Sequence, residues 1–457
     1  MLNRQVFRQY DIRGKAGSEL DDQAVDAISL AFARYVMEKG RKTLLVGRDN
    51  RFSSPHFRDL VVENLLASGL DVIDLGEVIS PVFYFASRYL DIDAGIMITA
   101  SHNPGPDNGF KLLLGTSTIY GDDIQDIADR AQRGEKLEAE SRGKLISVDI
   151  QSAYIQAIRE RITLGPKPLR VVVDCGNGTA GPIAPLLLRE LGCQVIELYC
   201  ESDPSFPHHH PDPVKVENSQ DLIKAVKDNG ADLGIGFDGD GDRLGVVAPD
   251  GTIIWGDMLM ILFWREIMVK HPGTDCIVEV KCSQALIDEI VRLGGKPLIY
   301  KTGHSLIKAK MKEINAVFTG EMSGHMFFAD EYYGYDDALY AAARLLRILS
   351  YSTQNLTQLL ADVPRYYATP ELRVKSSDEQ KFSIVNRVLE HFRPLYDMIE
   401  VDGARILFPG GWGLVRASNT GPELIVRCEG KSPEVLEEIK EQLFSYLGGL
   451  GLSIPEA

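Results

Sequence analysis

The sequence of 457 residues is poor in cysteine, and its cysteines form no paired pattern. They stand at positions 175, 193, 200, 276, 282 and 428, without the short spacings typical of zinc sites. Most of them lie in apolar runs that resemble β-strands. This distribution argues against a disulfide framework and a cysteine-bound metal, and it predicts reduced, buried thiols in a cytoplasmic protein.

The chain also lacks a segment suited to a membrane. The apolar run at residues 258–264 is far too short to cross a bilayer and is flanked by Asp257 and Arg265, so we expect a buried helix there. Three arginines near the N-terminus are followed by no apolar segment of the signal-peptide kind. We therefore expect no membrane association and a cytoplasmic location.

Positive charge is in the minority, because the formal net charge is −16. This balance argues against nonspecific binding to nucleic acids or acidic membranes, and an anionic substrate would need a local basic pocket. The hydrophobic share of 44% and the charged share of 25% are ordinary for a globular enzyme. The length predicts three or four domains rather than one core.

One strand–helix–strand unit is repeated three times along the chain. Each copy has a β-branched strand, a capping residue or proline that opens the helix, and a glycine that closes it. Strands that alternate with helices indicate parallel sheets covered by helices on both faces, with ligands beyond the carboxyl ends of the strands. Three copies favour three related domains, and the copies occupy residues 43–75, 170–199 and 276–300.

The last part of the chain has a different pattern, which predicts a small antiparallel α+β domain with freedom to move on a hinge. Its expected strands lie at residues 371–374, 404–409, 413–417 and 423–428, and its expected helices at residues 378–391 and 433–447.

The most informative motif is GFDGDGDR at residues 236–243, which places Asp238, Asp240 and Asp242 at alternate positions. Carboxylates this close repel one another unless a cation or a proton compensates, and oxygen ligands suit Mg²⁺ or Ca²⁺. A calcium EF-hand is excluded because Arg243 occupies the position that needs glycine, and a proline replaces the bidentate glutamate. The alternative is a solvated acidic turn, but a guanidinium beside a metal site favours a bound phosphate.

Three further polar loops follow apolar runs. TASHNP at residues 99–104 offers a serine that can act as a nucleophile or phosphoryl carrier, although its asparagine–proline pair alone indicates a turn. GEMSGH at residues 320–325 suits sugar hydroxyls or forms a polar turn. RASNTGP at residues 416–422 suits a phosphate or forms a hairpin loop. The histidines at residues 208–210 are bracketed by prolines, and we expect an ordinary loop there.

In this order and at these separations, the four loops resemble the α-D-phosphohexomutase family, in its phosphomannomutase/phosphoglucomutase branch. The resemblance covers essentially the whole chain, including YDIRG at 10–14, GFK at 109–111, HHPDP at 209–213, KTGH at 301–304 and FF at 327–328. It implies an α/β fold of three related mixed α/β domains plus a C-terminal α+β domain around a central cleft. The expected domains carry the phosphoserine, metal-binding, sugar-binding and mobile phosphate-binding parts in that order, at residues 1–148, 149–252, 253–366 and 367–457.

The resemblance also implies roles for individual residues. Ser101 is expected to be the phosphoserine and to hold Mg²⁺ together with Asp238, Asp240 and Asp242. The expected catalytic groups beside Ser101 are Arg13, Lys111, Arg243, His304 and His325. The expected substrate ligands are Tyr10, Lys281, Glu321 and Ser323, and for the nonreacting phosphate Arg416, Ser418, Asn419 and Thr420. Small departures stand at Ala100 and Gly421, positions that we expect to vary within the family.

The implied reaction is reversible phosphoryl transfer between C1 and C6 of glucose or mannose phosphates, through the phosphoserine and a hexose 1,6-bisphosphate that activates the enzyme. The acid–base group stays open among Arg13, Lys111, His304 and His325. The alternatives are a phosphoglucosamine mutase, which Met322 disfavours, a Mg²⁺-dependent sugar-phosphate phosphatase, which needs no second phosphate site, and a noncatalytic sensor. We expect hexose phosphates as ligands, no nucleic-acid or membrane partner, and a monomer.

Overall fold

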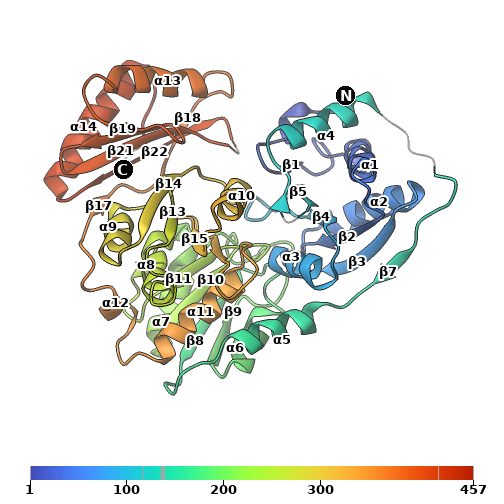
Figure 1. The fold of residues 1–457 in the computed structure, drawn as a ribbon, viewed down its shortest axis with the longest axis horizontal. Coiled ribbons are helices and arrows are strands. Elements are labelled where there is room, and N and C mark those ends of the chain that lie inside the picture. The colour runs from blue at the N-terminus through green and yellow to red at the C-terminus, as the bar shows by residue number, and fades with distance from the viewer. Residues whose placement is uncertain (1, 116, 135–138, 420, 456–457) are drawn as a thin grey trace.

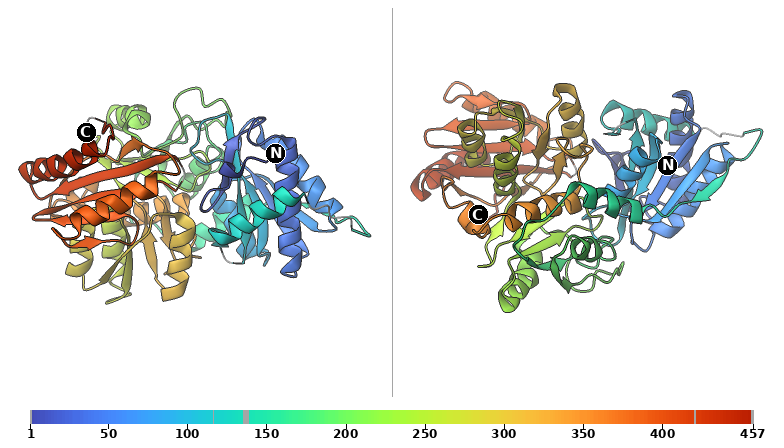
Figure 2. Two further views of the ribbon diagram at one scale, coloured as in Figure 1. Left: turned by 90° about the horizontal axis from the view of Figure 1, so that it is seen from above. Right: turned by 60° about the horizontal axis from the view of Figure 1, so that its bottom comes forward.

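A computed structural model describes residues 2–115, 117–134, 139–419 and 421–455. Four domains follow one another along the chain, and the first (blue) and fourth (red) lie on opposite sides of the molecule (Figures 1 and 2). The expected class of three mixed α/β domains and a C-terminal α+β domain is confirmed. None of the helices in the described part of the chain has the length and apolarity needed to cross a bilayer.

The first domain is built on a seven-stranded sheet with the order β1-β5-β4-β2-β3-β7 and with β6 paired to β5. Its elements are a 3₁₀ turn at Arg4–Val6, β1 (Ile12–Lys15), α1 (Asp22–Glu38), β2 (Thr43–Arg48), α2 (Ser54–Ala67), β3 (Asp71–Glu77), α3 (Ser80–Tyr89), β4 (Ala94–Ile98), β5 (Asp107–Leu114), β6 (Ser117–Thr118), α4 (Asp122–Arg133) and β7 (Leu145–Ser147).

Both faces of this sheet are covered, as the repeated pattern predicts. Alternate residues of β2 point to opposite faces, so Leu44 and Val46 join a core with α1 and α2, whereas Leu45 joins the core that includes α3. The pairing is parallel from β4 through β2 and β3 to β7 but antiparallel between β4 and β5. The strands of the repeated unit at residues 43–75 therefore pair in parallel, as expected. Residues 99–106 are too few for a helical crossover and return the chain antiparallel, which makes the sheet mixed.

The second domain repeats this arrangement in a five-stranded sheet with the order β12-β11-β10-β8-β9. Its central strands pair in parallel, and a short acidic loop at residues 238–243 turns β10 back into antiparallel β11. Pairing of β12 with β11 extends this sheet to Ile254, just beyond the boundary expected at residue 252. The elements are α5 (Gln151–Arg161), β8 (Arg170–Asp174), α6 (Ala184–Glu190), β9 (Gln194–Leu198), a 3₁₀ turn at Val216–Ser219, α7 (Gln220–Asn229), β10 (Leu233–Phe237), β11 (Leu244–Val247) and β12 (Ile253–Ile254).

The third domain contains two separate strand pairs. The parallel pair is β13 with β14, and residues 321–325 connect the antiparallel pair of β15 with β16. The elements are α8 (Gly256–Ile267), β13 (Asp275–Glu279), α9 (Gln284–Arg292), β14 (Lys296–Tyr300), α10 (His304–Ile314), β15 (Phe318–Gly320), β16 (Met326–Phe328), α11 (Ala338–Ser350) and α12 (Leu356–Leu359).

The fourth domain is a six-stranded sheet in which every pairing is antiparallel, as expected. Residues 418–422 connect β21 to β22, so each of the four predicted functional loops joins two antiparallel strands. The elements are β17 (Tyr367–Ala368), β18 (Leu372–Lys375), α13 (Lys381–Phe392), β19 (Met398–Ile399), β20 (Ala404–Phe408), β21 (Gly411–Ala417), β22 (Glu423–Gly430) and α14 (Pro433–Gly449).

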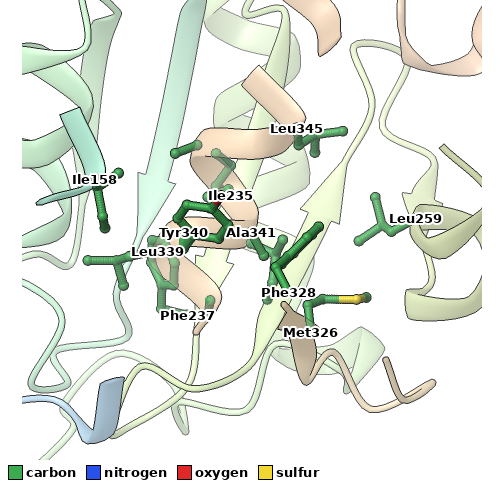
Figure 3. Packing of buried hydrophobic residues seen from close by; sticks show 14 of the residues in the cluster. Ile158, Ile235, Phe237, Leu259, Met326, Phe328, Leu339, Tyr340, Ala341 and Leu345 are labelled. Carbon is green, nitrogen blue, oxygen red and sulfur yellow. The ribbon is translucent and has the colours of Figure 1, made fainter. Parts of the chain in front are cut away.

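One large hydrophobic core joins the first three domains, whereas the fourth has a core of its own. Helix α11 packs in the shared core, where Tyr340 and Leu339 lie near Phe237 of β10 and Phe328 of β16 (Figure 3). The expected buried helix at residues 258–264 is part of α8, and Trp264 in it is fully buried. The fourth domain's core draws its residues from 372–454. The first three domains therefore form one packed body, to which the fourth is joined.

Candidate active site

A cavity of about 730 Å³ lies where the four predicted loops meet. Asp238 and Asp240 lie fully buried behind its wall, and Thr420 lies outside the described residues. The other expected site residues line this cavity: Tyr10, Arg13, Ser101, Lys111, Asp242, Arg243, Lys281, His304, Glu321, Ser323, His325, Arg416, Ser418 and Asn419.

Ser101 is held at the end of β4 in an unusual backbone conformation. Its φ of 52° lies in the left-handed region, which costs roughly 1–3 kcal/mol for a residue with a side chain. The Ser101 N–H donates to Thr99 Oγ1 at 2.9 Å, and the Ser101 Oγ donates to Asp238 Oδ2 at 2.7 Å. His102 Nδ1 lies 3.2 Å from the same Oγ. The buried hydroxyl is thus aimed at the acidic loop of the second domain.

Glycines allow the acidic loop to pass close to the serine loop, which is the segment at residues 99–106 between β4 and β5. A Cβ on Gly239 would lie 2.5 Å from the carbonyl oxygen of Ser101, so a side chain at this position would force the two loops apart. Gly241 has a φ of 73°, which glycine adopts without strain. Asp238 Oδ1 accepts the N–H groups of Asp242 and Arg243 at 3.0 and 3.1 Å. The loop therefore wraps around its own first carboxylate.

Lys111 on β5 is the cation nearest to the acidic loop. Its Nζ lies 2.6 Å from both Asp240 Oδ2 and Asp242 Oδ2, and it donates to Ser80 Oγ at 3.0 Å. Burial alone would lower the pKa of Lys111, but the two carboxylates raise it well above its usual value. Burial and the neighbouring carboxylates of Asp242 and Asp240 raise the pKa of Asp238. The ammonium thus neutralises only part of the negative charge.

The three aspartates retain capacity for a metal ion. Their ligand oxygens all lie within 4.8 Å of one another. Asp240 Oδ1 and Asp242 Oδ1 are buried, and neither accepts a hydrogen bond from any residue that the structure describes. Unpartnered carboxylate oxygens are costly in a protein interior, and oxygen ligands suit a hard cation. The donor set therefore fits a divalent cation such as Mg²⁺.

Glu321 and His325 line the cavity from the hairpin of the third domain. Glu321 Oε1 accepts the N–H of Gly303 at 2.8 Å, and burial raises the pKa of this glutamate. Arg243 Nε lies 3.1 Å from His325 Nε2. Ser323 on the same loop is partly exposed. The sugar-binding candidates Glu321 and Ser323 thus line the cavity on the same loop as His325, which contacts Arg243 of the acidic loop.

Asp336 is a buried residue of this site that sequence reasoning missed. Its Oδ2 lies 3.3 Å from His325 Nδ1 and 3.6 Å from His304 Nδ1, while Lys308 Nζ donates to its Oδ1 at 2.9 Å. Burial and the nearby Lys308 hold the pKa of His304 well below its usual value. The sequence signal at residues 335–337 is a tyrosine followed by two acids, which is common in exposed turns.

The phosphate-binding candidates cluster where the fourth domain meets the third. Arg416 Nε donates to Asp402 Oδ2 at 2.9 Å, and the same oxygen accepts the N–H of Thr302 at 3.0 Å. Arg416 Nη2 is buried and has no hydrogen-bond partner within the described ranges. Asn419 Nδ2 donates to Thr302 O at 3.4 Å. An unused, buried guanidinium donor suits an anionic ligand. Asp402 was not predicted, because a lone acid in a turn has no distinctive signal.

Lys281 and Arg13 bring further positive charge to the cavity. Lys281 Nζ donates to Glu371 Oε2 at 2.8 Å. Arg13 donates to Asp11 Oδ2 at 2.7 Å and to Asn103 Oδ1 of the serine loop at 2.8 Å. Despite the net charge of −16, the cavity therefore contains the local basic groups that an anionic substrate needs.

The histidines at residues 208–210 lie in a loop, as expected, beside the serine loop. His210 contacts the carbonyl oxygen of His102 through Nε2, and His209 Nε2 lies 3.0 Å from Asp174 Oδ2. The six cysteines are free and buried.

Comparison with known proteins divides the chain into the same four parts. Family models described as phosphoglucomutase/phosphomannomutase alpha/beta/alpha domains I, II and III match residues 4–138, 152–251 and 255–367, and the C-terminal domain model matches residues 371–445. The chain belongs to the phosphoglucomutase/phosphomannomutase family.

Individual members of this family resemble the chain over its whole length. It is 43% identical to the phosphomannomutase/phosphoglucomutase of Pseudomonas aeruginosa, over 99% of the chain and 98% of that protein. It is 41% identical to the phosphoglucomutase of Neisseria gonorrhoeae, over 96% of each. A crystal structure of a phosphoglucomutase/phosphomannomutase family protein from Burkholderia thailandensis superposes with a TM-score of 0.92 at 39% identity, covering both chains completely.

Proposed function

We propose that the chain interconverts the 1- and 6-phosphates of glucose and mannose by moving a phosphoryl group through Ser101. A single observation supports this proposal most: one cavity contains the hydroxyl of Ser101 at the acidic loop and the unpartnered guanidinium donor of Arg416 in the fourth domain. In the proposed reaction, a sugar with two phosphates occupies this cavity in either orientation. The family relatives that share the four domains support the same reaction class.

In the proposed reaction, Ser101 Oγ carries the phosphoryl group, and a sugar hydroxyl attacks the phosphorus in line. The hexose 1,6-bisphosphate turns end for end and returns its other phosphate to Ser101. Arg243 and Lys111 offset the negative charge that gathers at the phosphoryl group. Glu321 and Ser323 orient the sugar hydroxyls, while Tyr10 and Lys281 contact the substrate.

Mg²⁺ is the proposed metal, held by Asp238, Asp240, Asp242 and the phosphorylated Ser101. When bound, it supplies positive charge that polarises the phosphoryl oxygens.

The nonreacting phosphate is assigned to Arg416, Ser418, Asn419 and Thr420. Their domain has its own hydrophobic core, and an ion pair of 3.7 Å between Arg8 and Asp378 reaches from it to the first domain. These features support a mobile fourth domain, and we retain the domain limits 1–148, 149–252, 253–366 and 367–457, with β12 shared at the second limit.

Four groups are proposed for proton transfer, and they differ in the protonation state that their surroundings favour. The pKa of Lys111 is raised by its carboxylates, and Asp11 raises that of Arg13 against the effect of burial, so both stay protonated and suit a donor role. His304 is neutral and suits an acceptor role, because burial lowers its pKa. His325 is the fourth candidate, in contact with Arg243.

A monomer is the proposed working form, because one chain supplies all four parts of the cavity. The free, buried cysteines support a reducing, cytoplasmic location.

A coupled assay of glucose 1-phosphate and mannose 1-phosphate conversion, with and without the 1,6-bisphosphate, tests the proposal. We expect both sugars to be converted and the bisphosphate to stimulate the reaction. Release of inorganic phosphate in place of isomerised sugar would identify a phosphatase. Faster conversion of glucosamine phosphate than of either hexose phosphate would identify a phosphoglucosamine mutase.

A further inference from the structure

Arg51 lies in the loop after β2 and is almost completely buried, with 1% of its surface exposed. Its guanidinium has five N–H donors, which is the full complement of the group. Each of these finds an acceptor: Asp49 Oδ2 (3.1 Å) and the carbonyl oxygens of Ser101 (2.7 Å), Asn103 (2.7 Å), Pro104 (2.6 Å) and Asp107 (2.9 Å). Four of the five acceptors are backbone carbonyls, three in the serine loop and one at Asp107, where β5 begins.

The carbonyl of Ser101 is the most constrained of these acceptors. It accepts from Arg51 on one side and faces Gly239 of the acidic loop on the other, where a Cβ would come within 2.5 Å. Its own residue holds the left-handed φ of 52°. A strained conformation persists only where the surroundings impose it, and the guanidinium is a rigid, planar group that can impose the positions of several carbonyls together.

Asn50, the preceding residue, connects the same loop to the second domain. Its Nδ2 donates to Asn177 O at 2.8 Å, and its N–H donates to Thr179 Oγ1 at 3.1 Å. The N–H of Thr179 in turn donates to the carbonyl oxygen of Gly239 at 3.0 Å. Residues 49–51 therefore contact the serine loop directly and the acidic loop through one intermediate residue.

We propose that Arg51 is a positioning residue for phosphoryl transfer, which holds the serine loop so that Ser101 Oγ faces the acidic loop. This inference rests on the proposed role of Ser101. Arg51 does not line the cavity and contacts the reacting group only through the backbone. A purely structural arginine would stabilise the first domain without affecting the rate of transfer. Arg51 differs from a purely structural arginine because four of its N–H donors bind carbonyls of the segment that carries Ser101.

The test compares Arg51→Lys with Arg344→Lys in the full-length protein. Arg344 is equally buried at 1% exposure, and it donates to Glu266 and Asp330 rather than to a cavity loop. A lysine has one ammonium and cannot span four carbonyls. We expect kcat of Arg51→Lys to fall about a hundredfold with KM within about threefold of wild type, because misplacement of the reacting group by about 1 Å has that effect on rate. Arg344→Lys should retain kcat.

An activity-independent measurement accompanies the kinetics. Hydrogen exchange over residues 99–109 reports on the amides of Asn103 and Asp107, which are bonded within the loop. We expect exchange there about tenfold faster in Arg51→Lys than in wild type, and unchanged in Arg344→Lys. If wild type lacks mutase activity, the proposed function fails, whereas this exchange experiment still tests the role of Arg51.

Asp49→Asn provides a milder second variant should Arg51→Lys fail to fold. It retains the size of the side chain but removes the negative charge beside Arg51 Nε. We expect the same effects in the same direction, with kcat reduced about tenfold and KM nearly unchanged. Wild-type kcat and loop exchange in a folded Arg51→Lys or Asp49→Asn protein would overturn the inference. The inference would also be overturned if Arg344→Lys showed the same fall in kcat at the same loss of stability.

Discussion

The two ends of the cavity that are proposed to bind phosphate differ in how their groups are held. At the Ser101 end, three buried carboxylates, the Lys111 ammonium and a strained serine are packed between the first and second domains. These domains share a hydrophobic core. Because Gly239 has no side chain, the acidic loop can pass close to the carbonyl oxygen of Ser101, where a Cβ would clash. At this end, charges of both signs are held at fixed positions.

The Arg416 end lies on a domain that has its own core. Polar contacts join it to the third domain: Asp402 accepts from Thr302, Lys281 pairs with Glu371, and Asn419 donates to the carbonyl of Thr302. A small apolar cluster of Val280, Trp412 and Leu414 adds to this interface. No acidic triple comparable to residues 238–242 occurs among the described residues of this domain. This end offers donors to a phosphate, and its contact surface with the third domain is the one that the proposed domain motion would open.

The difference indicates a division of labour. Phosphoryl transfer needs reacting groups fixed in place before the reaction, which a shared core provides. The proposed binding of a second phosphate needs a surface that admits and releases a sugar bisphosphate, and a domain with its own hydrophobic core is suited to this role. If this comparison is right, substitutions at the Ser101 end should abolish the rate, and substitutions at the Arg416 end should mainly weaken binding.

The largest expected effect is that of Ser101→Ala. Loss of the proposed covalent carrier should reduce kcat by at least about a thousandfold. Mass spectrometry of the wild-type protein should find a phosphoryl group on this serine. Ser87→Ala, at a buried serine of α3 away from the cavity, serves as the control. Full activity in Ser101→Ala would refute the assignment of the reacting end.

Metal removal should have the next largest effect. EDTA treatment or Asp240→Asn should reduce turnover by roughly a thousandfold, about 4 kcal/mol of lost charge stabilisation. Titration of Mg²⁺ by calorimetry should show weaker binding to the Asp240→Asn protein. Asp74→Asn removes a buried, ion-paired aspartate elsewhere in the first domain and should leave Mg²⁺ binding intact. Undiminished turnover after EDTA treatment would remove the metal from the mechanism.

At the other end, Arg416→Ala should act more weakly. Loss of a charge-assisted contact with phosphate costs about 1.5–3 kcal/mol, or roughly ten- to a hundredfold in kcat/KM. Small-angle scattering should show that bisphosphate makes the wild-type particle more compact and that Arg416→Ala responds less. Arg393→Ala, on the surface of the same domain, is the matched control. An unchanged radius of gyration together with wild-type affinity in Arg416→Ala would contradict a closing fourth domain.

The smallest expected difference is that between the two sugars. Glucose and mannose differ at C2, whereas Glu321 and Ser323 are expected to contact O3 and O4. The specificity constants should therefore agree within about one order of magnitude, or roughly 1.4 kcal/mol. Glu321→Ala should weaken both reactions together. A preference of about a thousandfold would mean that a buried polar group contacts the C2 hydroxyl and distinguishes its two configurations.

Much of the local structure follows from local sequence signals. Helix α9 occupies residues 284–292, as its capping serine and closing glycine predict, and the strand patterns locate β2, β8 and β13 closely. The expected helix at residues 378–391 begins later, at Lys381, because residues 377–380 form a turn in which Asp378 pairs with Lys381. The hairpin of β15 and β16 was not predicted, since three-residue strands have too little periodicity.

By itself, the sequence determined the repeated units, the four polar loops and the chemical types that they contain, because these depend on neighbours within a few residues. No local pattern implied that Ser101 meets Asp238, which was expected from the family resemblance and is seen in the tertiary structure. Tertiary structure alone decided that Lys111 lies between Asp240 and Asp242 and that Asp336 lies beside His325. These partners are far apart in the chain, or come from different domains, and no periodicity relates their positions. Their distances are set by how the sheets pack on the shared core and by glycines that let loops of different domains approach one another.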